Sequence, residues 1–124
     1  FNTHFDHIGN VARKKSMDLI IQKINKLNYE GIPLIITGDF NLEDDNFSIK
    51  KIQNQFTDVL FGIKKSNKFY STFNNFNNKV ISGKRIDYIF IKNLKNIKST
   101  HVHLKSLSKN WASDHHPVLS ELKF

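Results

Sequence analysis

The chain has 124 residues, 39% hydrophobic and 24% charged, and this balance predicts one folded domain rather than a disordered segment. The absence of cysteine excludes disulfides and thiolate metal sites, and no run of roughly 18 apolar residues could cross a bilayer. The net charge of +8 favours a polyanionic partner, although AT-rich coding alone also produces such an excess of lysine beside many asparagines. Because the chain begins at Phe1 and not at methionine, we expect that preceding residues have been removed.

The first part of the sequence predicts a strand, a helix and a second strand. Residues 1–5 form the end of a strand, and a turn at 6–10 leads into a helix that stops near Asn28. The polar face of this helix includes Arg13, and its apolar face has helical spacing: Met17, Ile20, Ile21, Ile24 and Leu27. An apolar strand follows at 34–37. This order predicts a crossover unit with two parallel strands in one sheet.

The remaining sequence predicts one short helix and four strands. The helix covers 47–56, with the acids of 43–45 and Asn46 at its start. A short strand at 69–73 and an asparagine-rich loop at 74–78 come next, followed by strands at 84–91, 97–104 and 118–124. The strand at 84–91 is apolar on both faces, which predicts that it lies inside the protein.

The segment Gly38-Asp39-Phe40-Asn41 directly follows the apolar strand at 34–37. Asp39 and Asn41 are two residues apart, so a carboxylate and a carboxamide point the same way at the end of a buried strand. Such an arrangement predicts a site for a metal ion or a phosphate.

Asp87 is the exception in an otherwise apolar strand. A buried carboxylate is costly unless a cation or a hydrogen-bond donor meets it. Arg85 is a candidate, but we expect it to face away from Asp87. A histidine is therefore the expected partner, as in hydrolytic sites where an aspartate orients an imidazole.

A second polar cluster, Asp114-His115-His116, precedes the strand at 118–124. Pro117 restricts His116 to extended geometry. Neighbouring residues in an extended segment face opposite ways, so Asp114 and His115 would serve two related roles rather than one. The alternative interpretation is a polar turn with exposed histidines.

The segment His4-Phe5-Asp6-His7 has an alternative interpretation as the latter part of a zinc signature, His-x-His-x-Asp-His, of metallo-β-lactamase-like hydrolases. The first histidine of that signature is replaced by Asn2, and a zinc site needs three or four well-placed ligands. His7 is then most simply a turn residue.

Together these motifs resemble the endonuclease/exonuclease/phosphatase (DNase I-like) superfamily in order and spacing. The resemblance rests on Asn2-Thr3-His4, Gly38-Asp39-Phe40-Asn41, Arg85-Ile86-Asp87-Tyr88-Ile89-Phe90 and Ser113-Asp114-His115-His116-Pro117-Val118. It implies an α/β (α+β) fold, half of a four-layer β-sandwich with mixed sheets and outer helices. Residues 1–124 would form a single domain that corresponds to the C-terminal half of the family's domain.

The resemblance also implies that an N-terminal half is lacking. Members of the family carry an earlier asparagine and a metal-binding glutamate in a motif of the Leu-Gln-Glu type, and neither is present in this sequence. We therefore expect these residues alone to be inactive or very feeble.

By resemblance, the activity is that of a phosphoesterase that uses Mg²⁺, or Mn²⁺, and an activated water. Asp39 would orient or deprotonate that water and Asn41 would fix it, or both residues would ligate a second cation. His115, held by Asp87, would donate to the phosphate while His4 approaches it from another side. Asp114 would be a metal ligand, and Asn2 would take a supporting, substrate-binding position.

The expected substrate is a phosphate ester of a nucleic acid, a sugar or inositol phosphate, or a phospholipid head group. We expect no integral membrane segment and a monomer when the protein is full length. The alternative function is a non-catalytic, basic nucleic-acid-binding module that uses lysines for backbone contact and phenylalanines for stacking.

Overall fold

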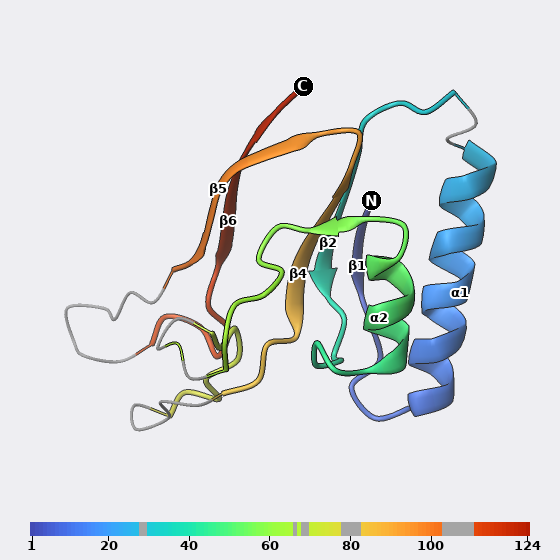
Figure 1. Ribbon diagram of the computed structural model, residues 1–124. Coiled ribbons are helices and arrows are strands. Elements are labelled where there is room, and N and C mark those ends of the chain that lie inside the picture. Colours follow the sequence, from blue (N-terminus) through green and yellow to red (C-terminus); the bar gives the residue numbers. More distant parts are fainter. Residues whose placement is uncertain (28–29, 66, 68–69, 78–82, 103–110) are drawn as a thin grey trace.

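The computed structural model describes residues 1–27, 30–65, 67, 70–77, 83–102 and 111–124. These residues form two helices, α1 (Asn10–Leu27) and α2 (Phe47–Gln53), and two sheets. The larger sheet has the strand order β1-β2-β4-β3. Its strands are β1 (Asn2–His4), β2 (Leu34–Asp39), β4 (Asp87–Lys92) and β3 (Thr57–Asp58). In the smaller sheet, β5 (Lys95–His101) pairs antiparallel with β6 (Val118–Lys123). Figure 1 shows the helices on one side of the larger sheet and β5 and β6 on the other.

Pairing in the larger sheet confirms the predicted crossover unit. Strand β1 runs parallel to β2 with α1 between them in the chain, and β4 runs antiparallel to β2. The result is a mixed sheet with helices on one face, which confirms the predicted fold class. Among the described helices, none is both long and apolar enough to cross a membrane.

The main core lies between the helices and the larger sheet. Ile36 of β2 and Phe90 of β4 are fully buried there, and Phe40 packs its ring edge against Phe90 with the ring centroids 5.4 Å apart. Residues of both helices complete this core: Met17, Ile21, Ile24, Ile49 and Ile52. Because side chains alternate along a strand, the neighbours of these strand residues point to the other face, toward β6.

Helix α1 differs from its predicted pattern at both ends. Arg13, expected on the polar face, is buried because its guanidinium donates to the Asp6 carbonyl and to the Asn10 side chain. Leu27, expected on the apolar face, is exposed, since it lies beyond the end of the core. The predicted end near Asn28 lies outside the described residues.

Other boundaries differ because tertiary contacts decide them. Helix α2 begins after Asn46, whose side chain accepts from the Ser48 amide, and it ends three residues before the predicted Phe56. Strand β3 was not predicted, and β4 begins at Asp87 instead of position 84. The predicted strand at 69–73 is wrong for its described part, where only Phe73 forms isolated bridges. Position 69, position 78 and the end of the predicted strand at 97–104 lie outside the described residues.

Candidate functional site

Three strand ends bring the predicted site residues together. In the register of the larger sheet, His4 pairs with Asp39 and Asp39 pairs with Asp87, so β1, β2 and β4 present these side chains in one row. Gly38 makes the close approach of β1 and β2 possible. Its φ is +151°, and a Cβ on this residue would lie 1.9 Å from the Thr3 carbonyl oxygen, so a larger residue would push the strands apart.

Asp39 is held by the residue two positions later. The Asn41 amide nitrogen donates to Asp39 Oδ1 over 2.8 Å, and the Asn41 side-chain nitrogen donates to Asp39 Oδ2 over 3.2 Å. That side-chain nitrogen also donates to the Phe5 carbonyl, which ties Asn41 to the end of β1. Asn41 adopts a φ of 50°, the left-handed turn that asparagine tolerates better than most residues. The predicted same-side arrangement of carboxylate and carboxamide is therefore a hydrogen-bonded unit.

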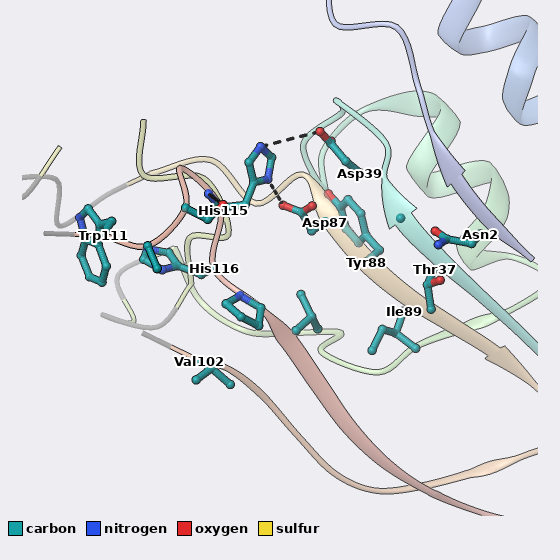
Figure 2. Close-up of a pocket in the computed structure, with 15 residues that line it drawn as sticks. Asn2, Thr37, Asp39, Asp87, Tyr88, Ile89, Val102, Trp111, His115 and His116 are labelled. Carbon is teal, nitrogen blue, oxygen red and sulfur yellow. Dashed lines mark hydrogen bonds and ion pairs between the residues drawn. The ribbon is translucent and has the colours of Figure 1, made fainter. Parts of the chain in front are cut away.

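Asp87 has the histidine partner that its buried position predicted. His115 Nδ1 lies 2.8 Å from Asp87 Oδ2, while the other ring nitrogen, Nε2, lies 3.9 Å from Asp39 Oδ2 (Figure 2). Arg85 points to the opposite side and forms a fully buried ion pair with Asp58. The expectation of a histidine rather than Arg85 is confirmed, and the histidine is the one that the family resemblance implied. Strand alternation does not explain the outcome, because residues 85 and 87 are two positions apart and would share a face; Arg85 instead lies before β4, which begins at Asp87.

The charges of this cluster shift two pKa values. Burial would by itself lower the pKa of His115, but the hydrogen bond to Asp87 and the negative charges around the ring outweigh it, so that the pKa of His115 is raised. Burial raises the pKa of Asp87, against the opposing hydrogen bonds from His115 and Thr72. The side chains of Asp39, Asp87 and His115 are 15%, 19% and 28% exposed, so the cluster is sheltered yet open to a ligand.

The remaining predicted residues surround this cluster at different distances. His4 Nε2 lies 3.3 Å from Asp39 Oδ2 on a largely exposed side chain. Asp114 is close enough for its charge to raise the pKa of His115. Asn2 lies farther along β1, beside Thr37 in the register, and Figure 2 shows it away from the Asp39 and Asp87 carboxylates.

The zinc interpretation of residues 4–7 finds no support in the geometry. His4 faces Asp39, whereas His7 lies 4.0 Å from Asp6 in the turn before α1. Among the described residues, the grouping of possible metal ligands consists of Asp39, Asp87 and His115, whose ligand atoms lie within 4.8 Å of one another.

The structure adds residues that sequence patterns did not identify. The Thr72 hydroxyl accepts from the amides of Ile86 and Asp87, and the Thr72 carbonyl accepts from the His116 amide over 2.7 Å. These hydrogen bonds join the start of β4 to the segment that carries His115, and Thr72 itself is fully buried. The sequence predicted only a strand at residues 69–73, and no sequence pattern marked the Thr72 hydroxyl for this role.

Asn74 and Phe73 support the same segment. The Asn74 side chain donates to the Ser113 carbonyl over 3.1 Å, and its backbone amide donates to the Asp114 carbonyl over 2.8 Å. Phe73 places its ring edge against the His115 ring, with centroids 5.0 Å apart. His116 is buried against Trp111, so the interpretation of exposed histidines is wrong for this residue.

A cavity of about 610 Å³ extends from this cluster between the two sheets (Figure 2). Its polar end contains the carboxylates and His115, and its walls are mostly apolar. The wall residues come from both sheets and from the segment before β6, and they include Thr37, Ile89, Val102, Trp111, Pro117 and Val118.

Comparisons with known proteins agree with this arrangement. A model of the Endonuclease/Exonuclease/phosphatase family matches residues 2–115. The solved structure of the mannosyl-6-phosphatase Bt3783 from Bacteroides thetaiotaomicron VPI-5482 is 30% identical, with a TM-score of 0.83 over 100% of this chain and 50% of that chain. No curated protein matches the sequence.

Two further structures show how widely the fold is shared. A conserved protein of unknown function from Enterococcus faecalis V583 is 26% identical, with a TM-score of 0.82 over 98% of this chain and 48% of that chain. TDP2 from D. rerio, complexed with single strand DNA product, is 21% identical, with a TM-score of 0.76 over 99% of this chain and 55% of that chain, and it is similar in fold alone. The present chain therefore spans about half the length of the structures that it matches.

Proposed function

Because the chain belongs to the endonuclease/exonuclease/phosphatase family, we propose that it hydrolyses a phosphate ester at the cluster of Asp39, Asp87 and His115, with a divalent cation. The observation that carries this proposal is the position of His115, whose two ring nitrogens face the carboxylates of Asp87 and Asp39 at 2.8 Å and 3.9 Å. A histidine held by one carboxylate beside a second, ligand-accessible carboxylate is suited to proton transfer and phosphate binding.

The proposed role of His115 is that of a hydrogen-bond donor to the phosphate. An ionised carboxylate only accepts hydrogen bonds, so the proton on Nδ1 is directed to Asp87 and Nε2 faces the open side of the site. The raised pKa of His115 favours a second proton on Nε2. That proton would stabilise the negative charge that spreads over the phosphate oxygens in the transition state.

Asp39 is assigned to the attacking water. Both of its oxygens accept from Asn41, which fixes the carboxylate with Oδ2 directed toward His4 and His115. In this position Asp39 would orient or deprotonate water, and His4 would donate to the phosphate from another side. The two protons on the Asn41 side-chain nitrogen are already directed to Phe5 and Asp39. Asn41 would therefore act mainly by holding Asp39 rather than by donating to substrate.

The donor set fits a hard divalent cation such as Mg²⁺ or Mn²⁺. Carboxylate oxygens dominate the cluster, and Mg²⁺ is usually bound by one or two carboxylates and completed by waters and substrate phosphate. Asp39 is the central candidate ligand. The side-chain oxygen of Asn41 and the carboxylate of Asp114 are the further proposed ligands. When bound, the cation would supply charge neutralisation at the phosphate oxygens.

The substrate class that we propose to test first is a sugar phosphate monoester. The reason is the similarity to a structure named as a mannosyl-6-phosphatase, at 30% identity over the whole of this chain. Nucleic acids, inositol phosphates and phospholipids complete the panel of substrates to be assayed.

We also propose that full turnover needs the part of the fold that this chain does not span. The experiment uses two proteins, the 124-residue chain and a completed domain in which it is joined to the half of the Bacteroides thetaiotaomicron structure that it does not cover. Both are assayed on the substrate panel with Mg²⁺, with Mn²⁺ and with EDTA.

We expect metal-dependent hydrolysis by the completed domain and little or none by the chain alone. Binding that weakens steeply with salt and is not followed by hydrolysis in a folded completed domain would instead favour the nucleic-acid-binding module. Full turnover by the chain alone would contradict the proposed need for the remaining half.

A further inference from the structure

A second cavity, of about 370 Å³, begins at His115 and Asn41 and so adjoins the catalytic cluster. Its walls come from the turn before α1, the loop between β2 and α2, and the segments around Phe73 and Lys84. Figure 1 shows that turn, that loop and the start of β4 at the same end of the larger sheet. Small-molecule sites have volumes of roughly 300–1,000 Å³, so a chemical group attached to a phosphate at His115 has space here.

The lining of this second cavity is mainly polar, whereas the cavity between the sheets has mostly apolar walls. Its lining includes the cations of Arg13 and Lys84, which donate hydrogen bonds, and the carboxylate of Glu43, which accepts them. One wall is apolar and belongs to Phe73, whose ring contacts the His115 ring with centroids 5.0 Å apart. The cavity therefore offers donors, an acceptor and a carbon surface to one ligand.

Arg13 is the buried part of this lining. It is 8% exposed, and its guanidinium donates to the Asp6 carbonyl and to the Asn10 side chain, which are both neutral acceptors. Its Nε has no hydrogen-bond partner among the described residues. A buried cation whose partners are all neutral is stabilised by a nearby ligand that carries oxygen acceptors. Arg13 therefore favours an oxygen-rich ligand in the cavity.

The charges in and beside the cavity balance when histidine is neutral. Lys65 lies 3.4–3.9 Å from the nearest carboxylate oxygen of each of three acids, Glu43, Asp44 and Asp45, and Arg13 and Lys84 supply the other two positive charges. The Asp45 side chain is 74% exposed and faces Lys65, so it belongs to the rim and takes no part in the contacts proposed here. A nucleic-acid strand or a second phosphate calls for an excess of positive charge. A neutral polyhydroxyl group instead needs donors and acceptors together, because each hydroxyl both donates and accepts.

From these observations we propose that the cavity binds the alcohol part of the substrate, and that this part is a neutral polyhydroxyl group. Glu43 accepts from its hydroxyls, Lys84 donates to them, and Phe73 packs against its carbon atoms. The inference rests on the proposed function, in which His115 donates to the phosphate, and it adds the residues that select the alcohol. Glu43 and Lys84 thus determine specificity and do not take part in the chemical step.

The test compares two phosphate monoesters in the completed domain with Mg²⁺. They are mannose 6-phosphate and phenyl phosphate, whose alcohol carries no further hydroxyl. The variants are Glu43→Gln and Lys84→Met, and Lys98→Met, at an exposed lysine of β5, is the matched control. We expect each variant to lower kcat/KM for mannose 6-phosphate by about tenfold and to leave phenyl phosphate within about twofold, because each removes a charged hydrogen bond to a hydroxyl. The control should change neither value.

Three outcomes would overturn the inference. Equal losses on both esters would show that Glu43 and Lys84 act on the phosphate or on folding and not on the alcohol. Unchanged kcat/KM for mannose 6-phosphate in both variants would show that the cavity does not hold the alcohol. A loss for Lys84→Met that is confined to a phosphorylated oligonucleotide would show that the ligand is a nucleic acid.

A binding measurement separates this inference from the proposed function. NMR titrations of the completed domain in EDTA give dissociation constants for mannose 6-phosphate and for inorganic phosphate without metal-dependent turnover. We expect Glu43→Gln to weaken binding of mannose 6-phosphate by about fivefold or more and to leave inorganic phosphate unchanged. That result in a domain that hydrolyses neither ester would contradict the proposed function alone. Equal affinity of the original domain and the variant for mannose 6-phosphate would overturn the inference.

Discussion

Replacing Asp87 by asparagine tests whether this carboxylate acts through His115. The variant keeps the size of the side chain but removes the negative charge that faces His115 Nδ1 at 2.8 Å. A hydrogen bond to a charged group contributes roughly 1.5–3 kcal/mol. Because the His115 side chain is 28% exposed, solvent screening places this pair near the lower end, at about 1.5–2 kcal/mol. The expected loss in kcat/KM is therefore on the order of 10- to 30-fold.

The assay is a double-mutant cycle in the completed domain. His115→Ala is expected to lower kcat by about a hundredfold or more, and Asp87→Asn should add little to it because the partner is already gone. Asp45→Asn, at an exposed acid near Lys65, is the control and should leave turnover unchanged. An NMR titration of the chain should also find that Asp87→Asn lowers the pKa of His115. If the kcat loss of the double variant equalled the product of the two single-variant losses, the coupling of Asp87 to His115 would be refuted.

Four further outcomes follow from the same contacts. Asp39→Asn should lower kcat of the completed domain by about a hundredfold without changing its thermal unfolding, and near-normal turnover would remove its assigned role. Thr72→Val should lower turnover by about fivefold or more through lost hydrogen bonds to the start of β4, and Thr72→Ser should restore it; equal losses would indicate a packing role instead. Arg85→Met should destabilise the chain in urea by about 3–5 kcal/mol, because it removes the cation from the buried Asp58 carboxylate and leaves only the neutral donors of Gln53 and Leu60; a change within about 0.5 kcal/mol would contradict this. The raised pKa of His115 means that its charged form stabilises the fold below its ordinary pKa of 6.5 and that this contribution is lost as pH rises through the folded pKa. His115→Ala should therefore cost more stability in mildly acidic than in alkaline buffer, and equal costs would argue against the ion pair.

Local patterns in the sequence were sufficient for much of the site. Strand alternation predicted that Asp39 and Asn41 share a side, and the hydrogen bonds of Asn41 agree. The crossover unit was predictable for the same reason, because periodicities of 2 and 3.6 report which way side chains point along one element. The separation of Arg85 from Asp87 does not follow from alternation, because the two residues are two positions apart; it arises because Arg85 lies before β4 and pairs with Asp58.

Contacts outside the regular pattern of a strand or helix were not predictable in this way. Arg13 was expected in solvent and is buried, since the Asp6 carbonyl in the turn before α1 and the side chain of Asn10, the first residue of α1, accept from its guanidinium. Thr72 gave no signal because a hydroxyl acquires its role only when β4 and the segment of His116 lie on either side of it. Strand β3 contains two residues, too few for any periodic pattern, and exists because β4 pairs with it.

The sequence by itself thus determined the kinds of chemistry present and the direction of each side chain along its own strand. Only the tertiary structure decided that His115 stands between Asp87, 28 positions earlier, and Asp39 in another strand, and that Ile35 is exposed while its register partner Ile91 is buried. The physical reason is that direction along a strand is fixed by local backbone geometry, whereas the neighbours of a strand are chosen by packing and hydrogen bonding over the whole chain.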